Sequence, residues 1–200
     1  MTVRPPAKVL RQIVYVVLAA GLLACQSSTS AQEANNAGID TTRVVPAPEA
    51  RTSPMAIAAG TLEDGTYVKV VYSSPRKRGR EIFGGLVPYG EVWRTGANEA
   101  TELTVTNTVK LGGHVVPAGT YSMFTIPGER QWTIIINRNL GQWGAYDYES
   151  EADLIRFNVP VLVSDRMHEA FTISIDDADK HTIRLNWDTV AIAISIEMSR

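Results

Sequence analysis

Strict alternation of apolar and polar residues in the C-terminal part of this 200-residue chain limits its fold more than any other feature. Apolar side chains occupy every second position over 171–175, 183–187 and 192–196. Successive side chains of a β-strand point to opposite faces, so each stretch predicts a half-buried antiparallel strand. Strands of this kind must bury one face against another layer of structure.

Two hairpins are predicted in the middle of the chain. Strand-forming residues run over 120–126, turn residues follow at 127–129, and alternation resumes at 132–136. Gly112 and Gly113 form a two-residue turn signal between two further apolar runs, which predicts the second hairpin.

Shorter runs at 67–72 and 154–163 bring the expected total to about eight to ten strands. The predicted fold class is therefore all-β, an antiparallel two-sheet β-sandwich of jelly-roll type with little helix. Helix is expected only as a turn or two near 148–156. Trp132 and Trp187 are in phase with the apolar residues around them, so we expect both in the core.

The first 24 residues have the layout of a lipoprotein signal peptide. An apolar run begins at Ile13 after a basic start, and it ends in the lipobox Leu22, Leu23, Ala24, Cys25. About 12 residues at about 1.5 Å each span about 18 Å, which is short of the about 30 Å hydrocarbon core of a membrane. Cys25 is the only cysteine, so it is the expected acylation site. The lipid would hold a bacterial envelope protein at a membrane, facing the periplasm or the exterior.

Residues 25–56 are expected to form a flexible tether, since their small and polar side chains offer little to bury. Residues 57–200 would then form one domain, large enough to fold without a disulfide or a metal. The formal charge of −2 gives no general attraction to nucleic acid, so no nucleic-acid partner is expected.

The most distinctive stretch is the glycine-rich run GREIFGGLVPYGEVWRTGANEAT at 79–101. The words PAGTYSMFTIPGE, WTIIIN and GQWG follow, ending at Gly144. In these words the chain resembles an uncharacterised bacterial family, labelled only as a domain of unknown function, whose members are exported proteins or lipoproteins. The resemblance implies a β-rich exported domain and carries no particular chemistry.

The same run holds the main candidates for ligand binding. Its glycines favour an ordered, irregular loop, and such loops on a rigid sandwich are common binding surfaces. Trp93, Arg94, Asn98 and Glu99 offer a flat face, a fork of donors, an amide and a carboxylate, which suits a sugar or a small carboxylate or phosphate. In the structural alternative, Arg94 pairs with Glu99 to brace the loop, Asn98 caps a turn and Trp93 fills the core.

Arg80 and Trp143 complete the candidate set. Trp143 lies beside glycines, as Trp93 does, so both indoles are candidates for stacking on a ligand. Arg80 ends a basic run that begins at Arg76, which either binds an anionic group or is a solvated loop.

No catalytic pattern stands out. The histidines lack metal-ligand spacing, no calcium loop or GxSxG is present, and abundant carboxylates do not by themselves identify a catalytic pair. We expect no metal and no cofactor, and we predict a noncatalytic, membrane-anchored binding domain for a glycan or a small anionic ligand. The alternatives are a structural or protein-interaction domain of the envelope, and a glycan-acting hydrolase that uses a carboxylate such as Glu99.

Overall fold

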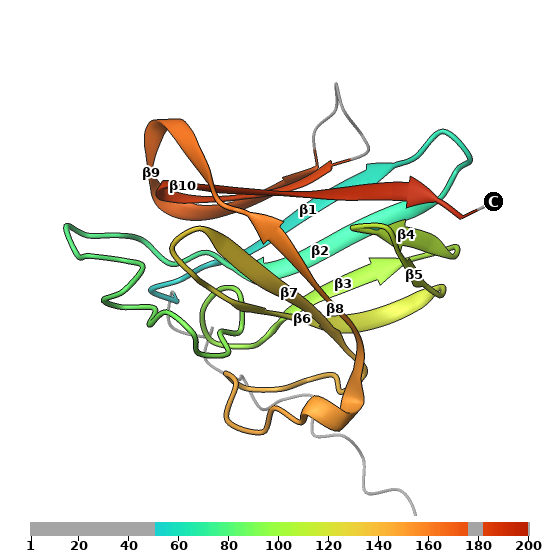
Figure 1. Ribbon diagram of the computed structural model, residues 1–200, viewed down its shortest axis with the longest axis horizontal. Helices are drawn as coiled ribbons and strands as arrows, with labels where there is room; N and C mark the ends of the chain where they lie inside the picture. Colours follow the sequence, from blue (N-terminus) through green and yellow to red (C-terminus); the bar gives the residue numbers. More distant parts are fainter. Residues whose placement is uncertain (1–50, 176–181, 200) are drawn as a thin grey trace, which may run out of the picture. The chain divides into compact units, whose positions relative to one another are not determined.

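The computed structural model describes residues 51–175 and 182–199, which form two antiparallel sheets (Figure 1). The larger sheet has the strand order β1-β2-β3-β6-β7-β8 and the smaller one β5-β4-β10-β9. The prediction of an all-β fold with two antiparallel sheets is confirmed. The bounds are β1 Met55–Thr61, β2 Tyr67–Ser73, β3 Thr101–Val105, β4 Val109–Leu111, β5 His114–Val116, β6 Gly119–Ile126, β7 Gln131–Asn137, β8 Asp153–Pro160, β9 Leu162–Ile175, β10 Thr182–Met198 and one 3-10 turn, η1, Ser150–Ala152.

Both predicted hairpins form, β6 with β7 and β4 with β5. Gly112 and Gly113 have φ angles of 55° and 82°, in the left-handed region that a two-residue hairpin turn requires. A Cβ at Gly112 would also lie 2.2 Å from the Phe157 ring. Position 112 therefore needs glycine for two reasons: its φ angle is positive, and the Phe157 ring leaves no room for a Cβ.

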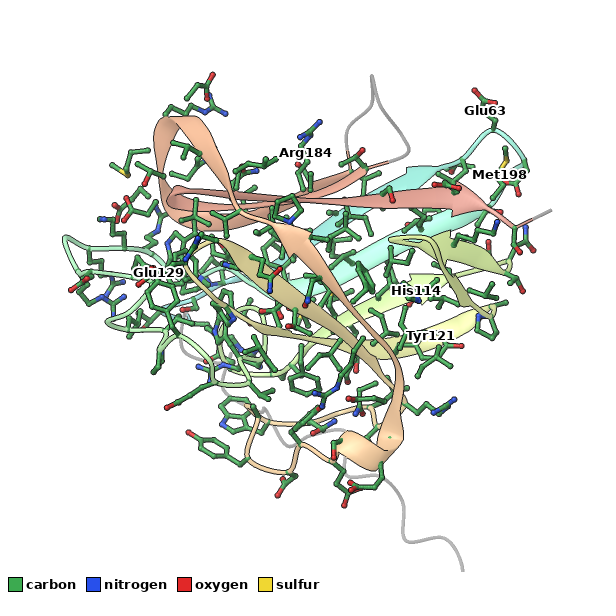
Figure 2. The ribbon with its side chains drawn as sticks, viewed as in Figure 1. Glu63, His114, Tyr121, Glu129, Arg184 and Met198 are labelled. Atoms are coloured by element: carbon green, nitrogen blue, oxygen red, sulfur yellow. The ribbon has the colours of Figure 1, made fainter. Side chains whose placement is uncertain are left out.

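The main core lies between the two sheets, where side chains of both layers meet (Figure 2). Val70 and Leu103 of the six-stranded sheet are fully buried in one cluster with Ile194 of the four-stranded sheet. Trp132 and Trp187 belong to the same cluster and are each 2% exposed, so their predicted core positions are confirmed.

β10 departs from the expected strand boundaries. The sequence predicts separate strands at 183–187 and 192–196, whereas the structure has one strand of 17 residues. The inward positions change from odd to even numbers after Trp187, and the register with β9 shifts at the same place. Asp188 has a φ of 55° at this bulge, which keeps both sets of apolar side chains in the core.

A smaller cluster of Ala100, Phe124 and Ile135 forms away from the main core, with Tyr148 packed against it. Phe124 and Ile135 alternate with inward-facing neighbours of β6 and β7, so they lie on the outer face of the six-stranded sheet. Residues 138–149 cover part of this outer face. Within residues 51–175 and 182–199, no helix has the length and apolar character needed to cross a membrane.

Candidate functional site

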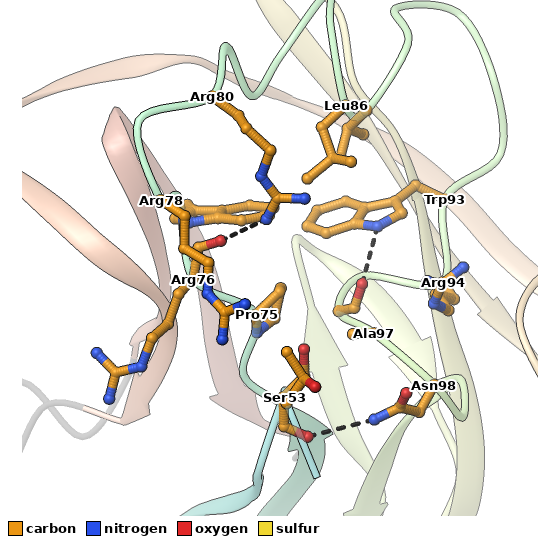
Figure 3. Close-up of a pocket in the computed structure, with 14 residues that line it drawn as sticks. Ser53, Pro75, Arg76, Arg78, Arg80, Leu86, Trp93, Arg94, Ala97 and Asn98 are labelled. Carbon is orange, nitrogen blue, oxygen red and sulfur yellow. Dashed lines mark hydrogen bonds between the residues drawn. The ribbon is translucent and has the colours of Figure 1, made fainter.

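A pocket of about 340 Å³, which we call the arginine pocket, is lined by three parts of the domain. Thr52 and Ser53 come from the segment before β1, most of the wall comes from the loop between β2 and β3, and Trp187 comes from β10. Among the described residues, the lining includes four arginines and no Asp, Glu, Lys or His (Figure 3). The arginines are Arg76, Arg78, Arg80 and Arg94.

Trp93 and Trp187 both line the pocket and stack on each other, with ring centroids 6.0 Å apart and an interplanar angle of 17°. Trp93 is only 8% exposed and also makes edge contacts with Phe83 and Trp132. The Trp93 indole therefore fills the core, which is the structural one of the two alternatives that the sequence left open. Its Nε1 donates to the Gly96 carbonyl at 3.0 Å.

Buried polar contacts fix the turn that follows Trp93. Thr95 is fully buried with a φ of 55°, and its carbonyl accepts a hydrogen bond from Thr101 Oγ1 at 2.7 Å. At Gly96 a Cβ would lie 2.9 Å from the Ser73 carbonyl oxygen, so only glycine allows this close approach of two backbone segments. The neighbours of this turn, Arg94 and Asn98, are thereby held at the pocket.

Two buried nitrogen atoms of pocket-lining residues, Arg94 Nε and Trp187 Nε1, have no hydrogen-bond partner in the part of the chain that the structure describes. Both atoms are donors, and a buried donor without a partner costs about 1–3 kcal/mol. Among the described residues, the Arg94 guanidinium makes no hydrogen bond or ion pair. Acceptor atoms of a ligand that reached these two nitrogens would give them partners.

The basic residues at 76–80 have two roles: Lys77 makes a structural ion pair, and the three arginines line the pocket. Lys77 forms an ion pair with Asp188 at the β10 bulge. Arg80 donates from Nε to the Lys77 carbonyl at 3.0 Å and from Nη2 to the Arg76 carbonyl at 2.6 Å. Figure 3 shows Arg76, Arg78 and Arg80 on the side of the pocket opposite Arg94. Positive charge therefore approaches the pocket from two sides.

Asn98 joins the pocket wall to the segment before β1. Its Nδ2 donates to the Ser53 carbonyl at 3.2 Å and to Ser73 Oγ at 3.4 Å. Its neighbour Glu99 accepts two hydrogen bonds from Arg51 Nη1, at 2.7 and 2.8 Å. The Arg94–Glu99 pair of the structural alternative does not form.

The environment of Glu99 lowers the pKa of its carboxyl group. Partial burial raises this pKa, but a hydrogen bond from the Glu99 backbone and the hydrogen bond and charge of Arg51 together outweigh it. Glu99 is therefore held as a carboxylate that secures Arg51 beside the pocket.

A second pocket of about 130 Å³ is lined by Glu99, Glu102 and Gln142. Gln142 Nε2 donates to the Asn139 carbonyl at 2.9 Å, whereas its buried Oε1 has no partner. Arg51 already engages the Glu99 carboxylate, so Glu99 and Glu102 do not form a free pair.

The structure brings together four of the six predicted ligand-binding residues. Arg80, Trp93, Arg94 and Asn98 line the arginine pocket, while Glu99 and Trp143 do not. Trp143 is 57% exposed, and its backbone bridges to that of Glu99. The predicted acylation site, Cys25, lies outside the described residues, and within the described part no three His, Cys, Asp or Glu side chains form a group suited to a metal ion.

Sequence reasoning missed Ser53 and Trp187 as pocket residues and treated Arg76 and Arg78 only as part of a basic run. Ser53 falls in the predicted tether, and Trp187 has the pattern of an ordinary core residue. One signal in the sequence could have found Arg76 and Arg78: they belong to the same basic run as Arg80, which was already a candidate.

Comparison with known proteins gives one finding. The family model described as "Protein of unknown function (DUF2911)" matches residues 53–196, which include the whole lining of the arginine pocket except Thr52. No curated protein and no solved structure matches the chain significantly. The resemblance to an uncharacterised family is thereby confirmed, and the chain belongs to the DUF2911 family of proteins of unknown function.

Proposed function

We propose that this domain binds a small anionic ligand in the arginine pocket, as the noncatalytic binding module of a lipid-anchored envelope protein. The observation that carries the proposal is the convergence of four arginines on one pocket, with no acidic residue among the described residues that line it. Like charges brought together repel one another, and an anion removes this repulsion. The guanidinium fork matches carboxylate and phosphate oxygens in geometry as well as charge.

The anionic group, rather than a sugar ring, is what this pocket selects. Stacking on a pyranose needs an open aromatic face, but Trp93 and Trp187 are 8% and 2% exposed. The exposed indole of Trp143 is not part of the pocket lining. A glycan would therefore bind in this pocket only through a charged group that it carries.

The arginine pocket does not favour the hydrolase alternative. Glycoside hydrolysis uses two carboxyl groups on either side of the scissile bond, and within 51–175 and 182–199 no carboxyl group lines this pocket. Glu99, the carboxylate considered for such a role, is engaged by Arg51.

Thermal melting at constant ionic strength tests the binding proposal. Sulfate and phosphate, with chloride as the balancing anion, should raise the melting temperature of the protein as RT ln(1 + [L]/Kd) requires. The variant Arg76→Gln/Arg94→Gln should lose this increase. Arg166→Gln, which removes an exposed arginine of β9 outside the pocket, should keep it. Equal increases in all three proteins would contradict binding in the pocket.

The membrane anchor is the second part of the proposal, and it is supported by the lipobox ending at Cys25. Cells that express the protein and are fed labelled palmitate should incorporate the label into the native chain and not into Cys25→Ser. Recovery of unlabelled native protein from the cytosol would contradict it.

A protein-interaction role is the second candidate, favoured by exposed apolar side chains on two edge strands. Met55 and Ile57 of β1 are 56% and 64% exposed, and Val163 of β9 is 86% exposed. A photo-crosslinking residue at Ile57 should capture one reproducible partner in cells if this role holds. The control places the photo-crosslinking residue at position 110, in place of Lys110 on β4. Equal capture of the partner at both positions would contradict the protein-interaction role.

A further inference from the structure

We infer that the group bound in the arginine pocket is the dianion of a phosphate monoester. This inference rests on the proposed function and narrows it to one ligand class. It follows from the charge of the lining, from the arrangement of its donors and from the absence of Asp, Glu, Lys and His among the lining residues that the structure describes.

The lining carries more positive charge than a single carboxylate neutralises. Each of the four arginines bears one positive charge at any pH near neutral, and each has five N–H donors. Among the hydrogen bonds of residues 51–175 and 182–199, only Arg80 uses some of these donors, for the carbonyls of Arg76 and Lys77. A phosphate monoester at neutral pH carries a charge of about −1.5 to −2 and three strong acceptor oxygens.

The donors approach from several directions. Arg76, Arg78 and Arg80 lie on one side of the pocket and Arg94 on the other (Figure 3). The buried, unpartnered N–H groups of Arg94 and Trp187 add donors from the lining itself. The three terminal oxygens of a tetrahedral phosphate point in three directions, whereas the two oxygens of a carboxylate share one plane. The tetrahedral group therefore satisfies this set of donors better.

The pocket also predicts how affinity depends on pH. Arginine does not titrate between pH 5 and 8, so the protein side of the contact keeps its charge. The neighbouring carboxylates are engaged outside the lining, Asp188 by Lys77, Glu169 by the Arg78 amide and Glu99 by Arg51. The second ionisation of the phosphate ester, with a pKa of about 6, is therefore the titration that controls binding.

Calorimetric titration with methyl phosphate and methyl sulfate tests the inference. The two esters have the same shape and three terminal oxygens, but methyl sulfate stays singly charged. Between pH 5 and pH 7.5 the dianionic fraction of methyl phosphate rises about tenfold, so its affinity should rise about tenfold. The affinity for methyl sulfate should stay constant, which controls for any titration of the protein.

Variants assign the effect to the pocket. Arg76→Gln, at an exposed position where folding is not at risk, and Arg94→Gln should each weaken methyl phosphate binding and flatten its pH dependence. Arg166→Gln should leave both unchanged. Equal binding of the two esters at both pH values would overturn the inference while leaving the proposed function intact. Failure of sulfate, phosphate and both esters to bind would overturn the proposed function as well.

A phosphate monoester occurs both in soluble metabolites and in lipid headgroups. The arginine pocket would bind the phosphate group of either in the same way. Full-length Cys25→Ser protein, which lacks the predicted acylation site, should be mixed with phosphatidylcholine vesicles that contain phosphatidic acid or phosphatidylglycerol. Sedimentation with phosphatidic acid alone, reversed by methyl phosphate, identifies a lipid source. Binding of methyl phosphate without sedimentation identifies a soluble one. Equal sedimentation with both lipids would contradict selection of a monoester.

Discussion

Two side-chain contacts fix the wall of the arginine pocket in place. Arg51 clamps the Glu99 carboxylate, and the adjacent Asn98 binds the Ser53 carbonyl. The two contacts fasten the segment before β1 to the loop that carries Arg94. Glu99 and Arg51 thus position the pocket without lining it.

Glu99→Gln should lower the free energy of unfolding at pH 7 by about 0.2–1 kcal/mol, because it removes a partly exposed ion pair. The pKa of Glu99 is lowered in the folded protein, so this stabilisation is present above the ordinary pKa of the carboxyl group. It is lost as the pH falls through the lower, folded value. Urea unfolding at pH 7 and at a series of acidic pH values should show a difference between the two proteins that is full at pH 7 and shrinks as the Glu99 carboxylate of the folded protein is protonated. A difference that persists at low pH would contradict this assignment.

At the residue scale the sequence indicated part of the pocket lining. The dense set of polar and aromatic residues at 93–99 includes Arg94 and Asn98, which line the pocket. The partner of Glu99 was not predictable, since Arg51 lies 48 positions away in a stretch with no strand pattern. The burial of Trp93 was left open because a tryptophan beside glycines is compatible with both surface and core.

At the scale of elements, tight turns and bulges decide where each strand faces. The β4–β5 hairpin turns through Gly112 and Gly113, which both require left-handed backbone. Only Gly112 also lies against another side chain, the ring of Phe157 in β8. The two glycines therefore separate the effect of backbone strain from that of steric overlap.

Gly112→Ala should destabilise the protein by about 2–4 kcal/mol, through about 1–2 kcal/mol of backbone strain and further overpacking against Phe157. Gly113→Ala meets no atom within 4 Å and should show the strain alone. Chemical denaturation of both variants measures the two costs. Equal destabilisation would show that the Phe157 ring moves aside without penalty.

The alternation of apolar and polar residues predicted that strands form at 183–187 and 192–196. It did not predict that the two stretches join into the single strand β10. The shift of inward positions after Trp187 is compatible with a break or with a bulge, and the residues alone do not choose between them. In the structure, Asp188 adopts the bulge conformation and binds Lys77, so the choice depends on a contact with a distant loop.

At the scale of the whole described domain, one core cluster spans both sheets. It contains Trp93, Trp132 and Trp187 together with apolar side chains from every strand of both layers. Three of the four tryptophans lie in this cluster, so a change in tryptophan fluorescence reports mainly the packing between the sheets, and far-ultraviolet circular dichroism reports the strands themselves. Because the cluster is contiguous, we expect both signals to change in one transition.

Ile194→Ala should lower the free energy of unfolding by about 2–5 kcal/mol, since Ile194 is fully buried between the sheets. Both signals should shift together to lower denaturant concentration. Val115→Ala, at a 53% exposed position in β5, should change stability little and serves as the control. Separate transitions for the two signals in Ile194→Ala would contradict a single cooperative core.

Thr52 and Ser53 belong both to the pocket wall and to the chain that enters the domain from its N-terminal side. A pulling force on that chain would act on the Arg51–Glu99 and Ser53–Asn98 contacts before it reached the β1–β2 ladder. Mechanical tension would thus open the wall while the sandwich stays intact. A bound ligand that bridges the two sides would raise the force at which this happens.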